Sequence, residues 1–152
     1  MKKSVLFVCT GNSCRSPLAE AWFNKRAAER NLKELTASSA GICAAAGGTA
    51  SMQSRTVAKE NGADLENFVS RQITLDMIRD ADLIIGMSQS HCRCIADAVP
   101  SAADKLRVLL SYDKGGDVAD PYGGSVELYR HTFAEMVPAI ENLINELEKK
   151  LI

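Results

Sequence analysis

The chain has 152 residues, 46% of them hydrophobic, and a formal net charge of -1 at pH 7. This length is sufficient for one domain with a substantial core, and the near-neutral charge without a basic stripe argues against a nucleic-acid partner. No apolar run approaches the length of a membrane span, so we expect no membrane partner. Five cysteines without a signal peptide indicate a reducing compartment, and we expect a cytoplasmic protein.

The first predicted element is a buried strand over residues 5–8, and it is followed by a loop of small residues. The loop reads Cys9-Thr10-Gly11-Asn12-Ser13-Cys14-Arg15-Ser16. Gly11 permits unusual backbone angles, and Asn12 tolerates the left-handed region. Ser16 is a good N-cap and Pro17 suits a first turn, which predicts a helix over residues 17–31. Inward-facing amides and the positive helix end would together bind an anion.

Cysteine and arginine occupy the positions in this loop that phosphoryl transfer requires. The positive potential at the centre of the loop favours the thiolate form of Cys9, which the Ser16 hydroxyl can also stabilise. The planar fork of Arg15 matches two phosphoryl oxygens better than a lysine would. We therefore expect thiolate attack on phosphorus and a phosphocysteine intermediate. The alternative is a tight βα turn around a structural cysteine.

The later elements alternate between strands and helices. Strands are predicted over residues 35–38, 81–87 and 105–110. Helices are predicted over residues 50–61, after the cap Thr74, over 89–99, and from 126 to 151 after the cap Ser125. This order predicts an α/β fold, a single-domain three-layer sandwich in which helices cover both faces of a four-stranded parallel sheet. Cys9 lies at the carboxyl end of a strand, where such sheets bind ligands.

A second loop near the C-terminus offers a proton donor for a leaving group. Asp120 precedes Pro121, which keeps the aspartate extended, and Gly123 and Gly124 continue the loop. Asp120 is the best candidate for a general acid. The alternative is an ordinary Asp-Pro turn.

Together the two loops make the chain resemble the low-molecular-weight protein phosphatases, which include phosphotyrosine and phosphoarginine enzymes. Residues 9–17 match the phosphate loop of that family, and the segment 120–122 matches its general-acid loop. The segments Ser39-Ala40-Gly41 and Arg71-Gln72-Ile73-Thr74 also look like family segments. The resemblance covers essentially the whole chain and implies one low-molecular-weight phosphatase domain over residues 1–152.

The resemblance also implies a role for each matching residue. Cys9 would be the nucleophile, Arg15 the phosphate clamp, and Asp120 first the acid and then the base. Further substrate or phosphate contacts would come from Thr10, Gly11, Asn12, Ser13, Cys14, Ser16 and Tyr122, with Ser39 in support. The expected partner is a phosphorylated protein substrate, with inorganic phosphate as product. No cofactor or metal is expected, and the protein would be a monomer or a weak oligomer.

Three features bear on the substrate within that family. Ser13 is small and polar, as in the arginine type, where phosphotyrosine members usually carry a bulkier aliphatic residue. Residues 42–50 lack the aromatic wall of the tyrosine type, and a phosphotyrosine ring would lose stacking of ~0.5–1.5 kcal/mol. Gly123-Gly124 stands where tyrosine-type members often have a second tyrosine. These features favour phosphoarginine over phosphotyrosine, although loop variation would also account for them.

Two other classes of function need consideration. Thioredoxin-coupled arsenate reductases share the fold, but their first relay cysteine lies where this chain has Ser88. The pair Cys92 and Cys94 is one residue apart, so its side chains diverge on a helix and cannot easily bond to each other. A catalytically silent phosphate-binding module is disfavoured because Cys9, Arg15 and Asp120 are all present.

Cys14 shares the phosphate loop with Cys9 and is a candidate for redox protection. A reversible disulfide between these two cysteines under peroxide would protect the nucleophile from further oxidation.

Overall fold

A four-stranded parallel sheet forms the centre of the computed structural model, which describes residues 2–151. The strands are β1 (Lys3–Cys9), β2 (Leu35–Gly41), β3 (Leu83–Gly86) and β4 (Leu106–Val108), and their order across the sheet is β2-β1-β3-β4. Helical crossovers connect them, as parallel strands require. The predicted α/β sheet is confirmed.

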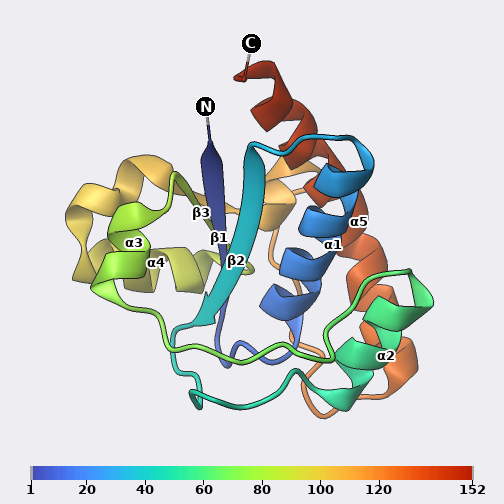
Figure 1. Cartoon of the computed structure of the whole chain (residues 1–152). Coiled ribbons are helices and arrows are strands. Elements are labelled where there is room, and N and C mark those ends of the chain that lie inside the picture. The colour runs from blue at the N-terminus through green and yellow to red at the C-terminus, as the bar shows by residue number, and fades with distance from the viewer. Residues whose placement is uncertain (1, 152) are drawn as a thin grey trace.

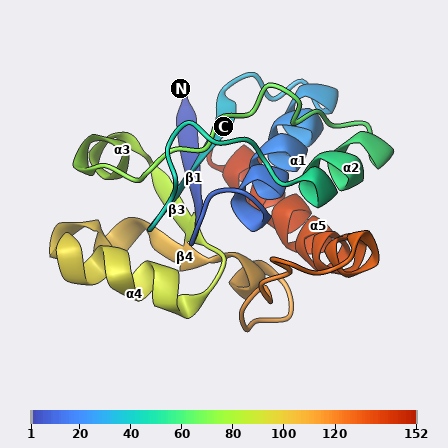
Figure 2. The ribbon, with the colours of Figure 1, turned by 90° about the horizontal axis from the view of Figure 1, so that it is seen from below.

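Helices cover both faces of this sheet (Figures 1 and 2). One face carries α1 (Arg15–Glu29), α2 (Met52–Glu60) and α5 (Val126–Lys149), and the other carries α3 (Leu75–Asp80) and α4 (Gln89–Ala98). Two short 3₁₀ helices, η1 (Pro100–Lys105) and η2 (Leu109–Tyr112), flank β4. The predicted three-layer arrangement is therefore confirmed.

Alternate residues of β1 belong to two different cores. Val5, Phe7 and Cys9 pack in the larger core with α1, α2 and α5, whereas Leu6 and Val8 pack in the smaller core on the other face. The period of two residues along a strand produces this division. It also directs the Cys9 side chain to the face that carries α1.

Several predicted boundaries are wrong by a few residues. The first helix begins at Arg15, not at Pro17, and its N-cap is Cys14 without a side-chain cap bond. Ser16, which we expected to be the N-cap, lies inside the first turn because its hydroxyl is engaged by Cys9 and Asn12 instead. The second strand continues to Gly41, and the third and fourth strands are shorter than predicted.

Other local signals are correct. Thr74 accepts a hydrogen bond from the N–H of Met77, and Ser125 accepts one from the N–H of Leu128, so both predicted caps are confirmed. The second helix ends at Glu60, close to Gly62 with its φ of +80°, as predicted.

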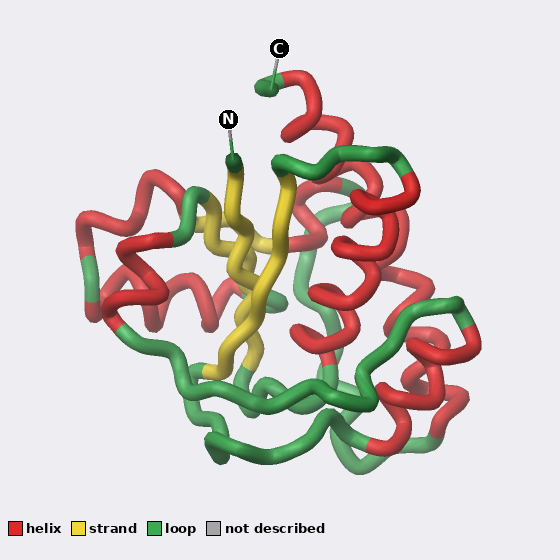
Figure 3. Tube along the Cα trace, viewed as in Figure 1, coloured by secondary structure: helices red, strands yellow, loops and turns green. Residues whose placement is uncertain are grey.

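The long loops gather at the carboxyl end of the sheet, below it in Figure 3. They include the segment between β1 and α1 and the segment after β2. Cys9, the last residue of β1, opens toward this end. Among the described residues, no helix has both the length and the apolar character to cross a bilayer.

Candidate active site

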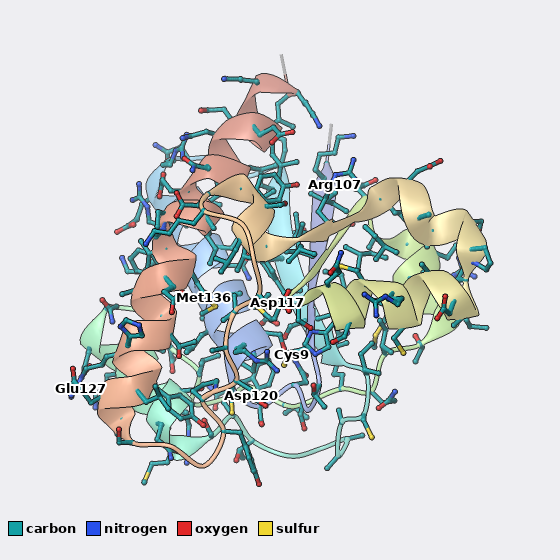
Figure 4. All side chains as sticks on the ribbon, turned by 180° about the vertical axis from the view of Figure 1, so that it is seen from behind. Cys9, Arg107, Asp117, Asp120, Glu127 and Met136 are labelled. Atoms are coloured by element: carbon teal, nitrogen blue, oxygen red, sulfur yellow. The ribbon has the colours of Figure 1, made fainter. Side chains whose placement is uncertain are left out.

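A pocket of about 240 Å³ lies at the carboxyl end of β1. Its walls come from the loop after β1 and from the loop before α5. Figure 4 shows Cys9 and Asp120 close together there, whereas Arg107 and Glu127 lie well away from them. The lining residues are Cys9, Thr10, Gly11, Ser13, Cys14, Arg15, Asp120 and Tyr122, all of which the sequence indicated.

Cys9 is buried at the floor of the pocket, with only 2% of its surface exposed. Its Sγ lies 2.9 Å from Ser16 Oγ. The Ser16 oxygen accepts a hydrogen bond from Asn12 Nδ2 at 2.9 Å, so its own O–H remains free to donate to the sulfur. This donor and the positive end of α1 both face the Cys9 sulfur.

Asn12 fixes the shape of the loop from within. Its φ is +53°, in the left-handed region, and the residue is fully buried. Nδ2 donates to Ser16 and also to Ser39 Oγ at 2.9 Å, while Oδ1 accepts the backbone N–H of Arg71 at 2.8 Å. Ser39, which we expected in a supporting role, thus contacts the loop through Asn12. The backbone of Arg71 was not foreseen.

The end of β2 packs directly against the phosphate loop. A Cβ atom added at Gly41 would lie 2.6 Å from the Thr10 carbonyl oxygen and 2.9 Å from the Asn12 nitrogen. Only glycine allows this approach. Two backbone hydrogen bonds continue the contact, from Ile42 to the Cys9 carbonyl at 2.9 Å and from Cys43 to the Thr10 carbonyl at 2.8 Å.

Glu20 is a further supporting residue that the sequence did not reveal. Ser39 Oγ donates to its carboxylate at 2.7 Å. Burial raises the pKa of Glu20, although the Ser39 hydrogen bond and the Arg71 charge act in the opposite direction. The local sequence around Glu20 gives no sign of this role, because Ser39 contacts Glu20 only in the folded chain.

Arg15 is 5% exposed and connects the two loops. One guanidinium nitrogen donates to the Val118 carbonyl at 2.9 Å, and another lies 3.7 Å from the Asp120 carboxylate. Within residues 2–151, the buried Nε has no hydrogen-bond partner. An oxyanion in the pocket would supply one, which suits the predicted phosphate clamp.

Asp120 and Tyr122 form the open rim of the site. The Asp120 side chain is 54% exposed, and its Oδ1 accepts the N–H of Tyr122 at 3.1 Å. Tyr122 is 76% exposed. Gly123 has a φ of +78°, which allows the chain to turn toward α5. Asp120 therefore has solvent access at the mouth of the pocket.

The acid loop is anchored just before Asp120. The Val118 N–H donates to the Met87 carbonyl, and Asp117 Oδ1 accepts the N–H of Gln89, both at 2.8 Å. These contacts hold the loop to the end of β3 and the first turn of α4. Sequence reasoning missed them because the partners are about 30 residues apart.

His91 is a second residue near the loop whose position the sequence did not indicate. Its Nε2 lies 3.0 Å from Thr10 Oγ1, and its Nδ1 accepts the N–H of Ser88 at 3.1 Å. The position three residues after Ser88 matches a capping box, which was the only local signal. Burial, and to a lesser extent the charge of Arg15, lowers the pKa of His91.

Cys92 and Cys94 do not form a relay toward Cys9. The Cys92 thiol donates to the Arg107 carbonyl at 3.2 Å, and Cys94 is exposed. Ser88, where an arsenate reductase would carry its first relay cysteine, caps α4.

Comparison with known proteins gives a consistent result. The model of the family described as low molecular weight phosphotyrosine protein phosphatase matches residues 4–151. A relative from Bacillus subtilis named protein-arginine-phosphatase is 38% identical, with 95% of this chain and 97% of the relative covered. The probable low molecular weight protein-tyrosine-phosphatase AmsI from Erwinia amylovora is 33% identical, with coverages of 98% and 100%.

Solved structures agree with the sequence matches. The low molecular weight protein tyrosine phosphatase from T. tengcongensis superposes with a TM-score of 0.89 at 37% identity, covering 95% of this chain and 99% of that one. A YwlE arginine phosphatase mutant with a phosphorylated active-site serine superposes with a TM-score of 0.91 at 35% identity, covering 96% of each chain. The arsenate reductase alternative finds no support in these matches.

Replacing Glu20 by glutamine should flatten the pH dependence of stability. Because the pKa of Glu20 is raised above its ordinary 4.5, the folded protein keeps this proton at pH values where the unfolded chain has lost it. The protonated Glu20 side chain therefore contributes its full stabilisation at pH values below the ordinary pKa of 4.5. This contribution is lost as the pH rises through the folded-state pKa. Glutamine still accepts from Ser39 but cannot ionise. Urea unfolding at a series of pH values measures the difference.

The exposed Glu34→Gln serves as the control for this series. Its profile should run parallel to that of the wild type. A parallel profile for Glu20→Gln as well would show that burial does not perturb this carboxyl.

Proposed function

Because the chain belongs to the low molecular weight phosphotyrosine protein phosphatase family, we propose that it hydrolyses phosphorylated side chains of proteins through a phosphocysteine on Cys9. The observation that carries this proposal is the convergence of Cys9, Arg15 and Asp120 on one pocket. We also propose that residues 1–152 act as a single domain. A silent phosphate-binding module would not need an acid at the rim of the pocket.

The first step transfers the phosphoryl group to the enzyme. The loop amides and Arg15 bind its oxygens, and the unpartnered Nε of Arg15 supplies one of the donors. The Cys9 thiolate attacks phosphorus and forms the S–P bond while the bond from phosphorus to the substrate oxygen or nitrogen breaks. Asp120 gives its proton to that leaving atom.

The second step regenerates the free enzyme. Asp120, now a carboxylate, takes a proton from water, and the resulting hydroxide attacks the phosphocysteine. Inorganic phosphate leaves, and Cys9 returns as a thiolate that the Ser16 hydroxyl stabilises at 2.9 Å. The YwlE arginine phosphatase mutant with a phosphorylated active-site serine supports a covalent intermediate in a protein of this fold.

The features of the pocket favour phosphoarginine as the substrate over phosphotyrosine. Ser13 gives the wall a small polar side chain, and residues 42–50 contribute no aromatic ring to the pocket. Asp120 already lies 3.7 Å from one guanidinium, that of Arg15, and its open side can face another. Two relatives are named protein-arginine-phosphatase, whereas others are named protein-tyrosine-phosphatases.

The cellular location, the partner and the oligomeric state are also proposals. Five free thiols suit a reducing compartment, and we propose the cytoplasm as the location. The partner is then a phosphorylated protein, and the enzyme works as a monomer or weak oligomer. The exposed rim formed by Asp120 and Tyr122 is open enough to admit a protein segment.

Asp120→Asn should slow hydrolysis most for poor leaving groups. Loss of a general acid typically costs 10²–10⁴-fold, but a good leaving group needs little protonation. The measurement is kcat/KM, which reports the first step and not the later hydrolysis in which Asp120 acts as the base, across aryl phosphates of graded phenol pKa, for the variant and the wild type.

Asp113→Asn, an exposed change at the end of η2 and earlier in the chain than Asp120, should leave the series unchanged. Equal slowing of kcat/KM for every substrate by Asp120→Asn, or no slowing at all, would remove the acid assignment. Cys9→Ser should abolish turnover and retain phosphate binding.

The substrate preference is tested by kcat/KM on a phosphoarginine peptide and a matched phosphotyrosine peptide with reductant present. The wild type should prefer phosphoarginine. Ser13→Ile should shift the ratio toward phosphotyrosine by about tenfold or more, since an apolar wall packs better on a ring than on a guanidinium.

Ser13→Thr keeps the hydroxyl and is the matched control, with the preference expected to persist. A wild-type enzyme that prefers phosphotyrosine would contradict the substrate assignment and leave the phosphatase mechanism intact.

We further propose that Cys14 protects Cys9 during oxidation. Both thiols are buried and line the same pocket. Peroxide takes two electrons from the Cys9 thiolate to give a sulfenic acid, and attack by the Cys14 thiol then releases water and forms the disulfide. Cys14 Sγ lies 3.1 Å from Tyr129 Oη. Burial raises the pKa of Tyr129 to about 12, so this phenol stays protonated beside the disulfide.

Cys14→Ser should remove the recovery of activity after peroxide. The wild type should regain most of its activity when reductant is added, whereas the variant loses it permanently because Cys9 proceeds to sulfinic acid. Mass mapping of the oxidised proteins identifies the species, and Cys43→Ser, which removes an exposed thiol, is the control. Detection of only sulfinic or sulfonic Cys9 in the wild type would rule out the disulfide.

A further inference from the structure

His91 lies in the first turn of α4 and reaches the phosphate loop. It is 6% exposed, and its Nε2 lies 3.0 Å from Thr10 Oγ1. Thr10 directly follows Cys9 and lines the pocket. The two residues are 81 positions apart, so the contact depends entirely on the tertiary fold. None of the chemical steps above uses this histidine.

The hydrogen bonds of the imidazole determine which nitrogen carries the proton. The backbone N–H of Ser88 points at Nδ1 from 3.1 Å, and an N–H can only donate. Nδ1 of the neutral ring is therefore the acceptor, and Nε2 carries the hydrogen and donates to Thr10 Oγ1. Burial and Arg15 keep the ring neutral by lowering its pKa, while Asp117 and Asp120 act weakly in the opposite direction.

Thr10 is held from its other side as well. Its carbonyl accepts the Cys43 N–H at 2.8 Å, and Gly41 approaches it so closely that no side chain would fit there. These contacts support Thr10 from the side of β2. The hydrogen bond between His91 of α4 and the Thr10 side chain supports Thr10 on its second side. The peptide groups next to Cys9 therefore keep their orientation.

The same turn of α4 also holds the acid loop. The Gln89 N–H donates to Asp117 Oδ1 at 2.8 Å, three residues before Asp120. Figure 4 shows Asp117 and Asp120 along the same loop. One turn of helix therefore contacts both sides of the reaction, the nucleophile loop through His91 and the acid loop through Gln89.

We propose that His91 is a positioning residue for the phosphatase reaction, acting through its Nε2–H bond to Thr10 to hold the nucleophile loop in register with the acid loop. This inference rests on the proposed function, since it concerns the same site. His91 is not among the residues that line the pocket, and it contacts the loop through Thr10. Its effect is on the placement of Cys9 relative to Asp120.

Two substitutions separate this role from capping of α4. His91→Asn places an amide oxygen near the Nδ1 position, so it keeps the acceptor for Ser88 but cannot reach Thr10. His91→Gln extends its amide nitrogen to about the Nε2 position and restores a donor to Thr10. We expect His91→Asn to lower kcat roughly 10- to 100-fold with little change in KM, as for a small misplacement of reacting groups. His91→Gln should recover most of that loss.

Thr10→Val completes a double-mutant cycle. It removes the acceptor of the same hydrogen bond, so combining it with His91→Asn should cost no more than either change alone. His131→Asn, on an exposed histidine of α5, is the control for both stability and rate. Thermal unfolding of every variant checks that the loss of rate is not a loss of fold.

A wild-type kcat in His91→Asn would overturn the inference. It would also be overturned if the losses of His91→Asn and Thr10→Val multiplied in the double variant. Loss of both rate and stability in His91→Asn and His91→Gln alike would also overturn it, because that pattern marks a structural histidine. Cys9→Ser, assayed in parallel, reports on the proposed function separately. Turnover that disappears with Cys9→Ser but is unaffected at His91 retains the phosphatase and rejects only the positioning role.

Discussion

The site depends on one buried amide, that of Asn12. A loop that turns its N–H groups inward must take at least one residue into the left-handed region, and Asn12 does so with a φ of +53°. Its side chain then makes the bonds that the irregular backbone lacks, to Ser16, to Ser39 and to the backbone of Arg71. The Ser16 branch continues to Cys9, and the Ser39 branch continues to Glu20. Loop shape and thiolate stabilisation therefore share one hydrogen-bonded network, which a glycine at this position could not provide.

Arg15 imposes a second requirement, because a buried guanidinium is costly unless its donors are paired. The protein pairs part of it with the Val118 carbonyl and places the Asp120 carboxylate nearby, but leaves Nε without a partner among the described residues. A phosphoryl group completes the set. Since Val118 belongs to the acid loop, the cation that would bind the substrate also fixes the loop that would protonate the leaving group.

Local signals in the sequence were sufficient for the strand before Cys9, for the caps Thr74 and Ser125, and for Cys9, Arg15 and Asp120 as candidates, whereas the family resemblance supplied the other residues that line the pocket. Local signals failed where tertiary contacts override a propensity. Ser16 has a good capping side chain, yet the helix begins earlier because Cys9 and Asn12 engage that hydroxyl. His91 depends on a partner 81 residues away, and no periodicity or spacing encodes such a contact.

The site has a buried region around Cys9 and an exposed rim around Asp120, and the two regions differ in their tasks. Cys9, Asn12 and Arg15 are almost wholly buried and are fixed by hydrogen bonds before any substrate arrives. Asp120 and Tyr122 lie on an open rim, with 54% and 76% exposure. In the proposed mechanism, attack on phosphorus would be preorganised in the same way for any phosphorylated side chain, and recognition of the leaving group would fall to Ser13 and to the exposed loops. Relatives carry the names of both arginine and tyrosine phosphatases. Such a division would allow both activities on one fold, because changes at the rim would alter the substrate without disturbing the nucleophile.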